Sequence, residues 1–199
     1  MSEEITRDDF SADAQDVEWM RAVAAGDMRA FESLIVAHQA RVVGTVAKML
    51  GDATDSEDIA QQVFIRVWKS AARYEPKAKF TTWLFKITRN LVFNELRRRK
   101  RHPATPLEHE QDEHHFQAAD VASMAPDASL LDAEMQAAIQ AAIDSLPETQ
   151  RLAIVLRRYE EMPYEEIGEV LGLSVPAVKS VLFRARADLK EKLRKYLEA

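Results

Sequence analysis

Apolar residues recur at intervals of three and four along most of this chain, and this spacing is typical of amphipathic helices. The stripe in the first half comprises Phe31, Leu34, Ile35, His38, Val42 and Met49. No run alternates between apolar and polar residues as a half-buried strand does. The 199 residues include only five glycines, too few for the phosphate-binding turns of Rossmann and P-loop folds. The sequence therefore predicts an all-α protein.

The composition is that of a soluble globular protein. The chain is 47% hydrophobic and 30% charged, and it has no cysteine, which excludes disulfides, thiolate zinc sites and cysteine nucleophiles. Its longest apolar runs are far shorter than the roughly 20 residues that span a bilayer. The first ten residues are acidic, where a signal peptide would be basic. We therefore expect a cytoplasmic protein without membrane insertion.

The net charge of −6 conceals a strong segregation of charge along the chain. Residues 1–18 carry a net charge of −6 and residues 103–134 carry −8. Residues 86–101 carry +6, and residues 175–195 carry +5. Two basic segments separated by an acidic one indicate two anion-binding surfaces on two modules.

The domain boundaries follow from a segment that has no helical periodicity. Residues 102–130 contain three prolines and scattered polar residues, and we expect a flexible acidic linker there. This linker separates two small helical domains, expected at residues 20–101 and 131–199. Residues 1–19 are expected to form an acidic N-terminal tail.

The segment YEEIGEVLGLSVPAVKSVLFRAR has the pattern of a helix-turn-helix. Gly168 is the small residue where two helices cross, Gly172 permits the tight turn, and Val178 locks the second helix into the core. Ser174 is suited to cap the second helix, and Pro176 falls in its first turn. A helix of this kind fits the major groove. We favour DNA binding over the alternative, an ordinary helical hairpin with a solvated basic face.

A second basic helix is expected to end at residue 101. Its polar face carries Lys86, Asn90, Asn94, Arg97 and Arg101. Aromatic and amide side chains beside a basic helix suit single-stranded DNA, because they stack on and hydrogen-bond to unpaired bases while Arg contacts the backbone. The alternative is that Phe80, Trp83 and Phe85 are core aromatics beside a solvated basic run.

A third helix is predicted from the capping box TDSE at 54–57. One face of this helix carries Ile59, Val63 and Val67. The opposite face carries Phe64 and Trp68, which we expect to be exposed anchors within an acidic and amide rim, as in a helix that docks on another protein. The alternative is a helix of the hydrophobic core whose other face is solvated and binds no partner.

The chain resembles the bacterial extracytoplasmic-function (ECF) sigma factors in three segments. These are DSEDIAQQVFIRVWKS (55–70), FTTWLFKITRNLVFNELRRRKR (80–101) and LPETQRLAIVLRRYEEMPYEEIGEVLGLSVPAVKSVLFRARADLK (146–190). The resemblance follows the family's order from about Asp27 onward. It implies sigma domains two and four, joined by a linker, in a subunit that directs RNA polymerase to promoters and has no catalytic activity.

The resemblance also implies roles for individual residues. Binding to core polymerase is implied for Asp55, Asp58, Gln61, Gln62, Phe64 and Trp68. Binding to the minus-ten element is implied for Tyr74, Phe80, Thr81, Thr82, Trp83, Asn90, Asn94, Arg97, Arg98, Arg99 and Arg101. Binding to the minus-thirty-five element is implied for Ser174, Pro176, Ala177, Lys179, Ser180, Phe183, Arg184 and Arg186.

The chain departs from the family's common pattern within the last of these sets. It has Pro176 and Ala177 where Gly-Thr is common, and Val181 where Arg is common. These differences bear on which minus-thirty-five sequence the chain prefers. The implied partners are core RNA polymerase, promoter DNA and a cognate anti-sigma factor, in a stress or envelope response, with no cofactor and no small-molecule substrate.

Two other functions compete with this interpretation. A metal hydrolase is suggested by the linker residues His102, His109, Glu110, Asp112, Glu113, His114 and His115. However, HEQDEH has one residue more than the zinc-protease signature HExxH, so its histidines would not share a helix face. We expect no metal site and interpret the segment as a mobile acidic linker, whose charge we hypothesise to mimic nucleic acid on the polymerase. A self-sufficient helix-turn-helix regulator would need a dimerisation or sensor region, and none is evident.

Overall fold

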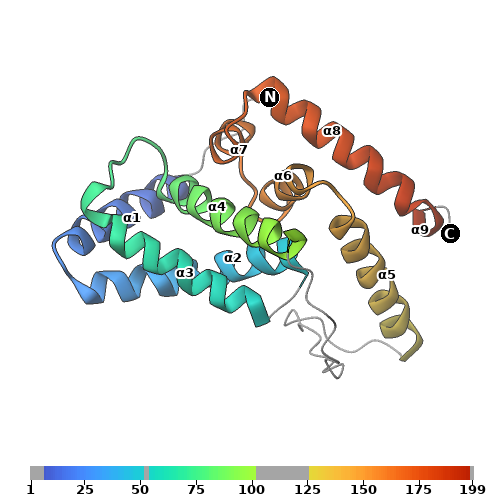
Figure 1. Cartoon of the computed structure of the whole chain (residues 1–199), viewed down its shortest axis with the longest axis horizontal. Helices are drawn as coiled ribbons and strands as arrows, with labels where there is room; N and C mark the ends of the chain where they lie inside the picture. The colour runs from blue at the N-terminus through green and yellow to red at the C-terminus, as the bar shows by residue number, and fades with distance from the viewer. Residues whose placement is uncertain (1–6, 52–53, 102–125, 198–199) are drawn as a thin grey trace.

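The computed structural model describes residues 7–51, 54–101 and 126–197, and every regular element in these residues is a helix (Figure 1). The prediction of an all-α fold is confirmed for this part of the chain. None of the helices described is long and apolar enough to cross a membrane. The histidines of the predicted linker lie outside the described residues.

The N-terminal module is built from α1 (Arg7–Ala24), α2 (Met28–Leu50), α3 (Thr54–Ser70), the short 3-10 helix η1 (Ala71–Arg73) and α4 (Phe80–Arg101). Its longest helix, α2, has clear start and stop signals. The Asp27 carboxylate accepts hydrogen bonds from the backbone N–H groups of Arg29 and Ala30, at 2.8 and 3.2 Å. Gly51 ends α2 in the left-handed conformation, with φ of 71°.

The predicted apolar stripes form the core of this module. On α2 the side chains of Leu34, His38, Val42 and Met49 are buried. On α3 the buried face comprises Ile59, Val63 and Val67, as predicted. Residues Phe31 and Ile35 of the same α2 stripe are only partly buried, because they border a groove described below.

The C-terminal module is built from α5 (Pro126–Asp144), α6 (Glu148–Arg158), α7 (Tyr164–Leu171), α8 (Val175–Lys192) and α9 (Arg194–Leu197). Helices α7 and α8 form the predicted helix-turn-helix. A Cβ at Gly168 would lie 2.6 Å from the backbone oxygen of Leu173, so only glycine permits this close approach. Gly172 turns the chain with φ of 70°. Ser174 is the N-cap of α8, but its side chain makes no capping hydrogen bond.

The predicted domain boundaries fall inside helices. The boundary between residues 19 and 20 lies within α1, where Asp16, Met20 and Val23 are all buried. The boundary between residues 130 and 131 lies within α5, which begins at Pro126. The residues called an acidic tail therefore include most of α1, which packs on α2 and η1.

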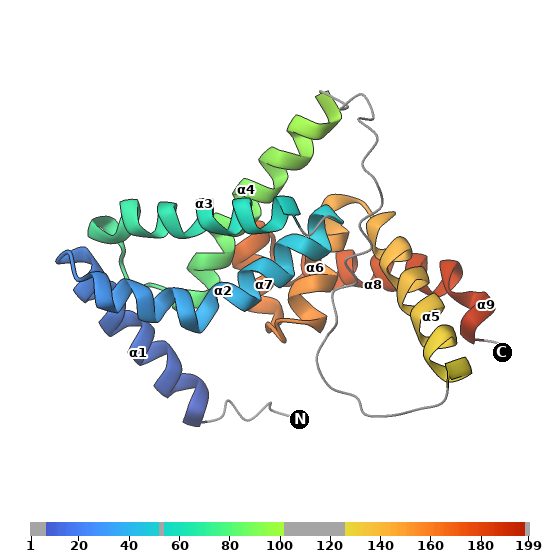
Figure 2. The ribbon, with the colours of Figure 1, turned by 90° about the horizontal axis from the view of Figure 1, so that it is seen from below.

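The two modules pack against each other, which the sequence did not indicate. Helix α7 lies along α4, and α6 packs on α2 (Figures 1 and 2). The guanidinium of Arg151 donates to the carbonyl oxygen of Met49 at 2.7 Å, and that of Arg89 donates to the carbonyl oxygen of Val170 at 2.8 Å. Buried apolar side chains of both modules belong to one continuous core.

We predict that Gly168→Ala lowers the free energy of unfolding by about 1–3 kcal/mol, because the new methyl group meets backbone that cannot rotate away. The matched control is Gly44→Ala in α2, where a Cβ would have no neighbour within 4 Å outside the backbone of its own helix. This control is expected to be neutral or to raise the stability by up to about 1 kcal/mol through helix propensity. Denaturant titrations followed by circular dichroism measure both, and equal stability of the two variants would contradict the prediction.

Candidate nucleic-acid interface

Helix α8 has one buried face and one exposed basic face. Val178, Leu182 and Ala185 are buried as predicted, packed against α6 and α7. The predicted DNA-facing residues of the helix body are all exposed, namely Lys179, Ser180, Phe183, Arg184 and Arg186. Phe183 is 74% exposed and places an apolar ring among these groups. The face is thus a strip of basic groups around one apolar ring.

The start of α8 holds the remaining predicted residues of this set. Ser174 and Pro176 are exposed and Ala177 is half-buried. Val181 is buried in the core, with 8% of its surface exposed. Position 181 therefore faces the protein interior in this chain.

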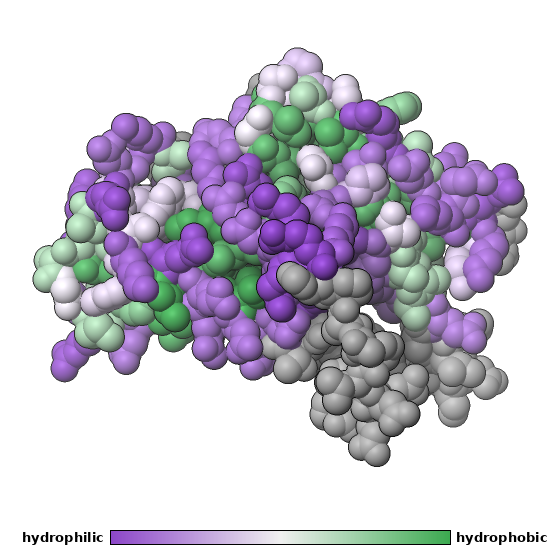
Figure 3. Space-filling view, viewed as in Figure 1, coloured by the Kyte–Doolittle hydropathy of each residue, from purple (hydrophilic) through white to green (hydrophobic). Residues whose placement is uncertain are grey.

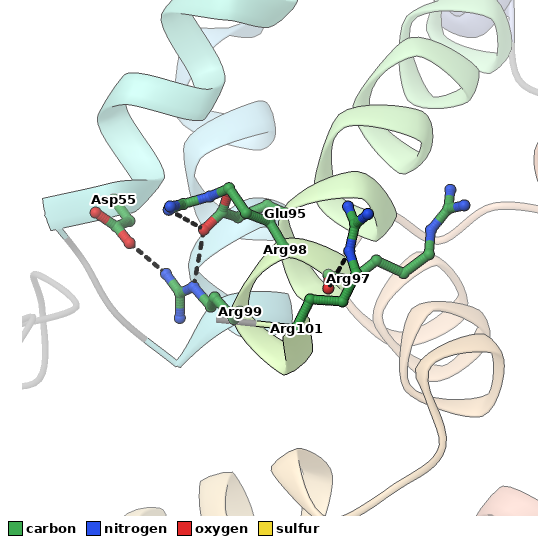
Figure 4. Close-up of polar contacts among 6 residues, drawn as sticks. All are labelled: Asp55, Glu95, Arg97, Arg98, Arg99 and Arg101. Carbon is green, nitrogen blue, oxygen red and sulfur yellow. Dashed lines mark hydrogen bonds and ion pairs between the residues drawn. The ribbon is translucent and has the colours of Figure 1, made fainter. Parts of the chain in front are cut away.

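The arginines at the end of α4 fall into two groups, whose side chains point in different directions (Figure 4). Arg98 and Arg99 both donate to the carboxylate of Glu95, at 2.7 and 3.1 Å for their Nε atoms. Arg99 also contacts Asp55 of α3 at 2.5 Å and the carbonyl oxygen of Leu50 at 3.2 Å. Because the Arg98 guanidinium donates to it, the pKa of the Glu95 carboxyl lies below its ordinary value. Arg99 therefore ties α4 to its neighbours, whereas Arg98 pairs within α4 itself.

Arg97 and Arg101 point away from this ion-pair group (Figure 4). Both are exposed, and Arg97 donates to the side-chain oxygen of Asn94 at 2.8 Å. Figure 3 shows strongly hydrophilic side chains gathered over this end of α4, in the middle of the face. The predicted minus-ten set is thus divided: Asn94, Arg97 and Arg101 form an exposed strip, while Arg98 and Arg99 are engaged with carboxylates.

The aromatic residues before and at the start of α4 form a cluster. Tyr74 and Trp83 are half-buried with ring centroids 5.0 Å apart, and the Phe80 ring lies 5.9 Å from that of Trp83. Phe80 is fully buried, as is Thr82, whereas Thr81 is half-buried. The interpretation of Phe80 as a core aromatic is therefore correct, and only the outer members of this cluster present a surface.

Helix α1 contributes acidic groups to this cluster, which the sequence analysis missed. The Asp13 carboxylate accepts a hydrogen bond from the backbone N–H of Phe80 at 2.8 Å and so caps α4. The Asp16 carboxylate lies 2.8 Å from Nε2 of the buried His38. Burial, followed by the charges of Asp13 and Asp16, raises the pKa of Tyr74 to about 12. A residue of N-cap type far from the helix that it caps gives no local signal in the sequence.

The predicted docking helix α3 presents Asp58, Gln61 and Gln62 to solvent, and Asp55 is half-buried. The expectation that Phe64 is an exposed anchor is wrong, because its side chain is only 6% exposed. Trp68 is half-buried and its ring packs 5.0 Å from that of Phe31. The residue missed on this helix is Ile65, which is 50% exposed.

Phe64 instead lines a groove of about 590 Å³ between α2 and α3. The apolar residues of this groove come from both helices and include Phe31, Ile35, Val43, Ala60, Phe64 and Ile65. Polar side chains, among them Gln39, Glu57 and Gln61, border it. The candidate docking surface is therefore a groove that two helices share, and it has the apolar centre and polar rim of a protein-binding site.

Two family models match this chain. The model described as "Sigma-70 region 2" matches residues 34–102, which contain α3, α4 and most of α2. The model described as "Sigma-70, region 4" matches residues 136–189, which contain the helix-turn-helix.

Similar proteins match over most of their length. The chain is 32% identical over 187 residues to the RNA polymerase sigma-H factor of Pseudomonas aeruginosa, covering 92% of this chain and 96% of that protein. It is 30% identical over 175 residues to the ECF RNA polymerase sigma-E factor of Escherichia coli K12, covering 86% and 90%. The solved structure of CnrH in complex with the cytosolic domain of CnrY is similar with a TM-score of 0.66 and 26% identity, covering 91% of this chain and 98% of that one.

We predict that Arg99→Ala lowers the free energy of unfolding by about 1–2 kcal/mol, because it removes the bonds that join α4 to Asp55 and Leu50. The matched control is Arg101→Ala on the same helix, which is expected to change the stability by less than about 0.5 kcal/mol. Thermal and denaturant unfolding measure both variants. A greater loss of stability in Arg101→Ala than in Arg99→Ala would refute the division of the basic run.

Proposed function

Since this chain belongs to the ECF sigma factors of the sigma-70 family, we propose that it binds core RNA polymerase, recognises the minus-ten and minus-thirty-five elements of promoters, and directs the initiation of transcription. The proposal assigns no catalytic step to the chain itself. It acts in the cytoplasm, where the polymerase works on DNA.

The observation that carries the proposal is the two-faced helix α8. Its buried face holds Val178, Leu182 and Ala185, so the helix cannot turn about its axis without exposing them. Its exposed face then presents Lys179 and Arg184 to a major groove, with positive charge for phosphates and donors for base edges. This arrangement supports recognition of duplex DNA at the upstream promoter element.

The strip on α4 supports a different contact. Asn94, Arg97 and Arg101 offer amide and guanidinium groups along one exposed line, which begins about three turns after the half-buried ring of Trp83 on the same helix. A stacking surface at one end of a helix and a basic line at the other suit a strand whose bases are unpaired. We propose that this strip follows the backbone of the melted minus-ten strand.

The groove between α2 and α3 supports docking on polymerase. Its apolar lining is bordered by Glu57 and Gln61 of α3, and Asp58 and Gln62 are exposed on the same helix. A helix of the partner with apolar residues at its centre and basic residues at its edge would match this surface.

We propose that a regulatory protein holds the chain inactive until a stress or envelope signal releases it. The support is the similarity to CnrH, whose structure contains the cytosolic domain of CnrY. A regulator of this kind would act as an anti-sigma factor if it covered the surfaces that meet polymerase or DNA.

The chief alternative is a self-sufficient helix-turn-helix regulator. Such a protein binds its operator without polymerase, whereas a sigma factor needs core enzyme. In vitro transcription with purified core polymerase distinguishes the two. We expect promoter-dependent transcripts only when both core enzyme and this chain are present.

We predict that Asp58→Arg weakens binding to core polymerase about tenfold, because it places a positive charge on the exposed side of α3, next to Glu57 of the docking groove. The matched control is Glu18→Arg, the same charge reversal at an exposed position of α1, and it is expected to bind core normally. Competition with a labelled wild-type chain measures both affinities. Normal core binding by Asp58→Arg would show that this side of α3 is not part of the docking surface.

We predict that Arg184→Ala reduces transcription from a promoter that requires its upstream element about tenfold, since one base contact is worth roughly 1–3 kcal/mol. Core binding and helical content should stay unchanged. Lys190→Ala, an exposed basic residue farther along α8, is the control. If Arg184→Ala together with Lys179→Ala leaves footprint and transcript levels unchanged, α8 does not read the upstream element.

A further inference from the structure

The first turn of α4 has no capping carboxylate of its own. The residue before the helix is Lys79, whose ammonium group cannot accept a hydrogen bond, and the first turn contains no acidic residue. The Asp13 carboxylate of α1 instead accepts a hydrogen bond from the backbone N–H of Phe80 at 2.8 Å. A negative charge suits this end of a helix, because the helix dipole is positive there. The start of α4 therefore depends on a side chain 67 residues earlier in the chain.

Phe80 is held a second time through its ring. Asp16, one turn after Asp13 on α1, lies 2.8 Å from Nε2 of His38, and the side chains of Asp16 and His38 are both buried. The His38 ring packs on the Phe80 ring, with the ring centroids 5.1 Å apart. The two carboxylates of α1 thus act on one buried residue, Asp13 through its backbone and Asp16 through His38.

Phe80 is the buried member of the aromatic cluster. Its ring centroid lies 6.2 Å from that of Tyr74 and 5.9 Å from that of Trp83. Tyr74 and Trp83 are half-buried, whereas Phe80 is fully buried. Unpaired bases can therefore stack only on the two outer rings. The position of Phe80 determines where these two rings lie.

No hydrogen bond anchors the Tyr74 side chain within the described part of the chain. Its hydroxyl is buried and has no hydrogen-bond partner there. Burial, followed by the charges of Asp13 and Asp16, raises the pKa of Tyr74 to about 12, so the hydroxyl stays protonated at neutral pH. The ring is thus held by packing, and a closely packed interior transmits a displacement of one ring to its neighbours.

We propose that Asp13 and Asp16 are positioning residues for the minus-ten strand. They hold Phe80 in place, and Phe80 holds the rings of Tyr74 and Trp83 on which unpaired bases stack. Neither carboxylate contacts DNA. The inference rests on the proposed function, because that function assigns the minus-ten strand to this surface. Helix α1 is then part of the promoter-reading module.

The sign of the effect separates positioning from simple electrostatics. Asp13 lies near a surface proposed for DNA, so its negative charge by itself repels phosphates, and removal of that charge would strengthen binding. Loss of the hydrogen bond to Phe80 should instead weaken binding, because the start of α4 and the rings beside it lose their fixed position. Weaker DNA binding after removal of an acid is therefore the result that identifies positioning.

Substitutions at Asp13 test the proposal in holoenzyme reconstituted with core polymerase. Asp13→Ala removes the acceptor, and Asp13→Asn keeps an acceptor oxygen without the charge. Glu18→Ala, which removes an exposed carboxylate from the same helix, is the matched control. The probe is a fluorescent single-stranded oligonucleotide that carries the minus-ten element of a promoter transcribed by the wild-type holoenzyme. We expect Asp13→Ala to bind it at least about fivefold more weakly than wild type, and the other two variants to stay within about twofold.

The same comparison applies to the second carboxylate. Asp16→Ala leaves the buried His38 without its partner, whereas Asp16→Asn keeps an acceptor for Nε2–H of His38. We expect Asp16→Ala to weaken binding of the oligonucleotide at least about fivefold, and Asp16→Asn to weaken it less. Wild-type affinity for the oligonucleotide in Asp13→Ala or in Asp16→Ala overturns the proposal.

Two further measurements exclude a general loss of stability. Core binding, and binding of the holoenzyme to minus-thirty-five duplex, should be unchanged in Asp13→Ala, and a parallel loss of either overturns the proposal. Hydrogen exchange followed by mass spectrometry should be faster at residues 78–84, around the start of α4, but not along α8, and Asp13→Asn should restore the protection. If Asp13→Ala does not fold, Asp13→Glu replaces it, because the longer side chain keeps the charge but displaces the carboxylate from the Phe80 N–H.

Transcription by the reconstituted holoenzyme separates failure of this inference from failure of the proposed function. If the wild-type holoenzyme initiates at a promoter but Asp13→Ala binds the oligonucleotide as wild type does, only the positioning role is wrong. If the wild-type holoenzyme initiates at no promoter, the proposed function is wrong, and the positioning role falls with it.

Discussion

The rest of this structure depends on the burial of one side of α4. Leu84, Phe85, Leu91 and Val92 are buried among the helices around them, and burial of such a side chain stabilises a fold by roughly 1.5–3 kcal/mol. This burial determines how α4 is rotated about its axis. The polar side chains of the helix must then line the opposite side, where α7 covers the first turns and Arg97 and Arg101 extend beyond it. The candidate DNA surface and the surface that packs on the C-terminal module are therefore two parts of one helix face.

The elements and their buried faces could be predicted because helical periodicity is a local property. The same holds for Gly168 and Gly172, whose requirement for a missing side chain follows from a turn a few residues long. The predictions that failed depend on contacts between residues far apart in the sequence. Phe64 looked like an exposed anchor because its helix face was judged without α2, which covers it. The packing of α7 on α4 joins residues more than 80 positions apart, and the sequence has no local pattern that records such a pairing.

The net charge of each sequence segment also did not predict which charged side chains have partners within the fold. The basic run at the end of α4 reads as one anion-binding patch, but Glu95 and Asp55 engage two of its arginines. The acidic N-terminal residues read as a solvated tail, but Asp13 caps α4 and Asp16 contacts His38. Arg99, Asp13 and Asp16 each meet a partner from another element, and these contacts are structural. The surface proposed for DNA at the end of α4 therefore keeps only the exposed Arg97 and Arg101.

The positions of these acids explain how a chain with a net charge of −6 can present basic surfaces to DNA. Charges in water at physiological salt act over a Debye length of about 8 Å, so a DNA strand responds to its immediate neighbours rather than to the total charge. The neighbours along α8 are Lys179, Arg184 and Arg186, and this surface is exposed. The neighbours along the first turns of α4 include Glu166 and Glu169, which pair with Lys79 and Lys86. The local charge is therefore basic along α8 and nearly balanced at the start of α4, although both helices belong to one acidic chain.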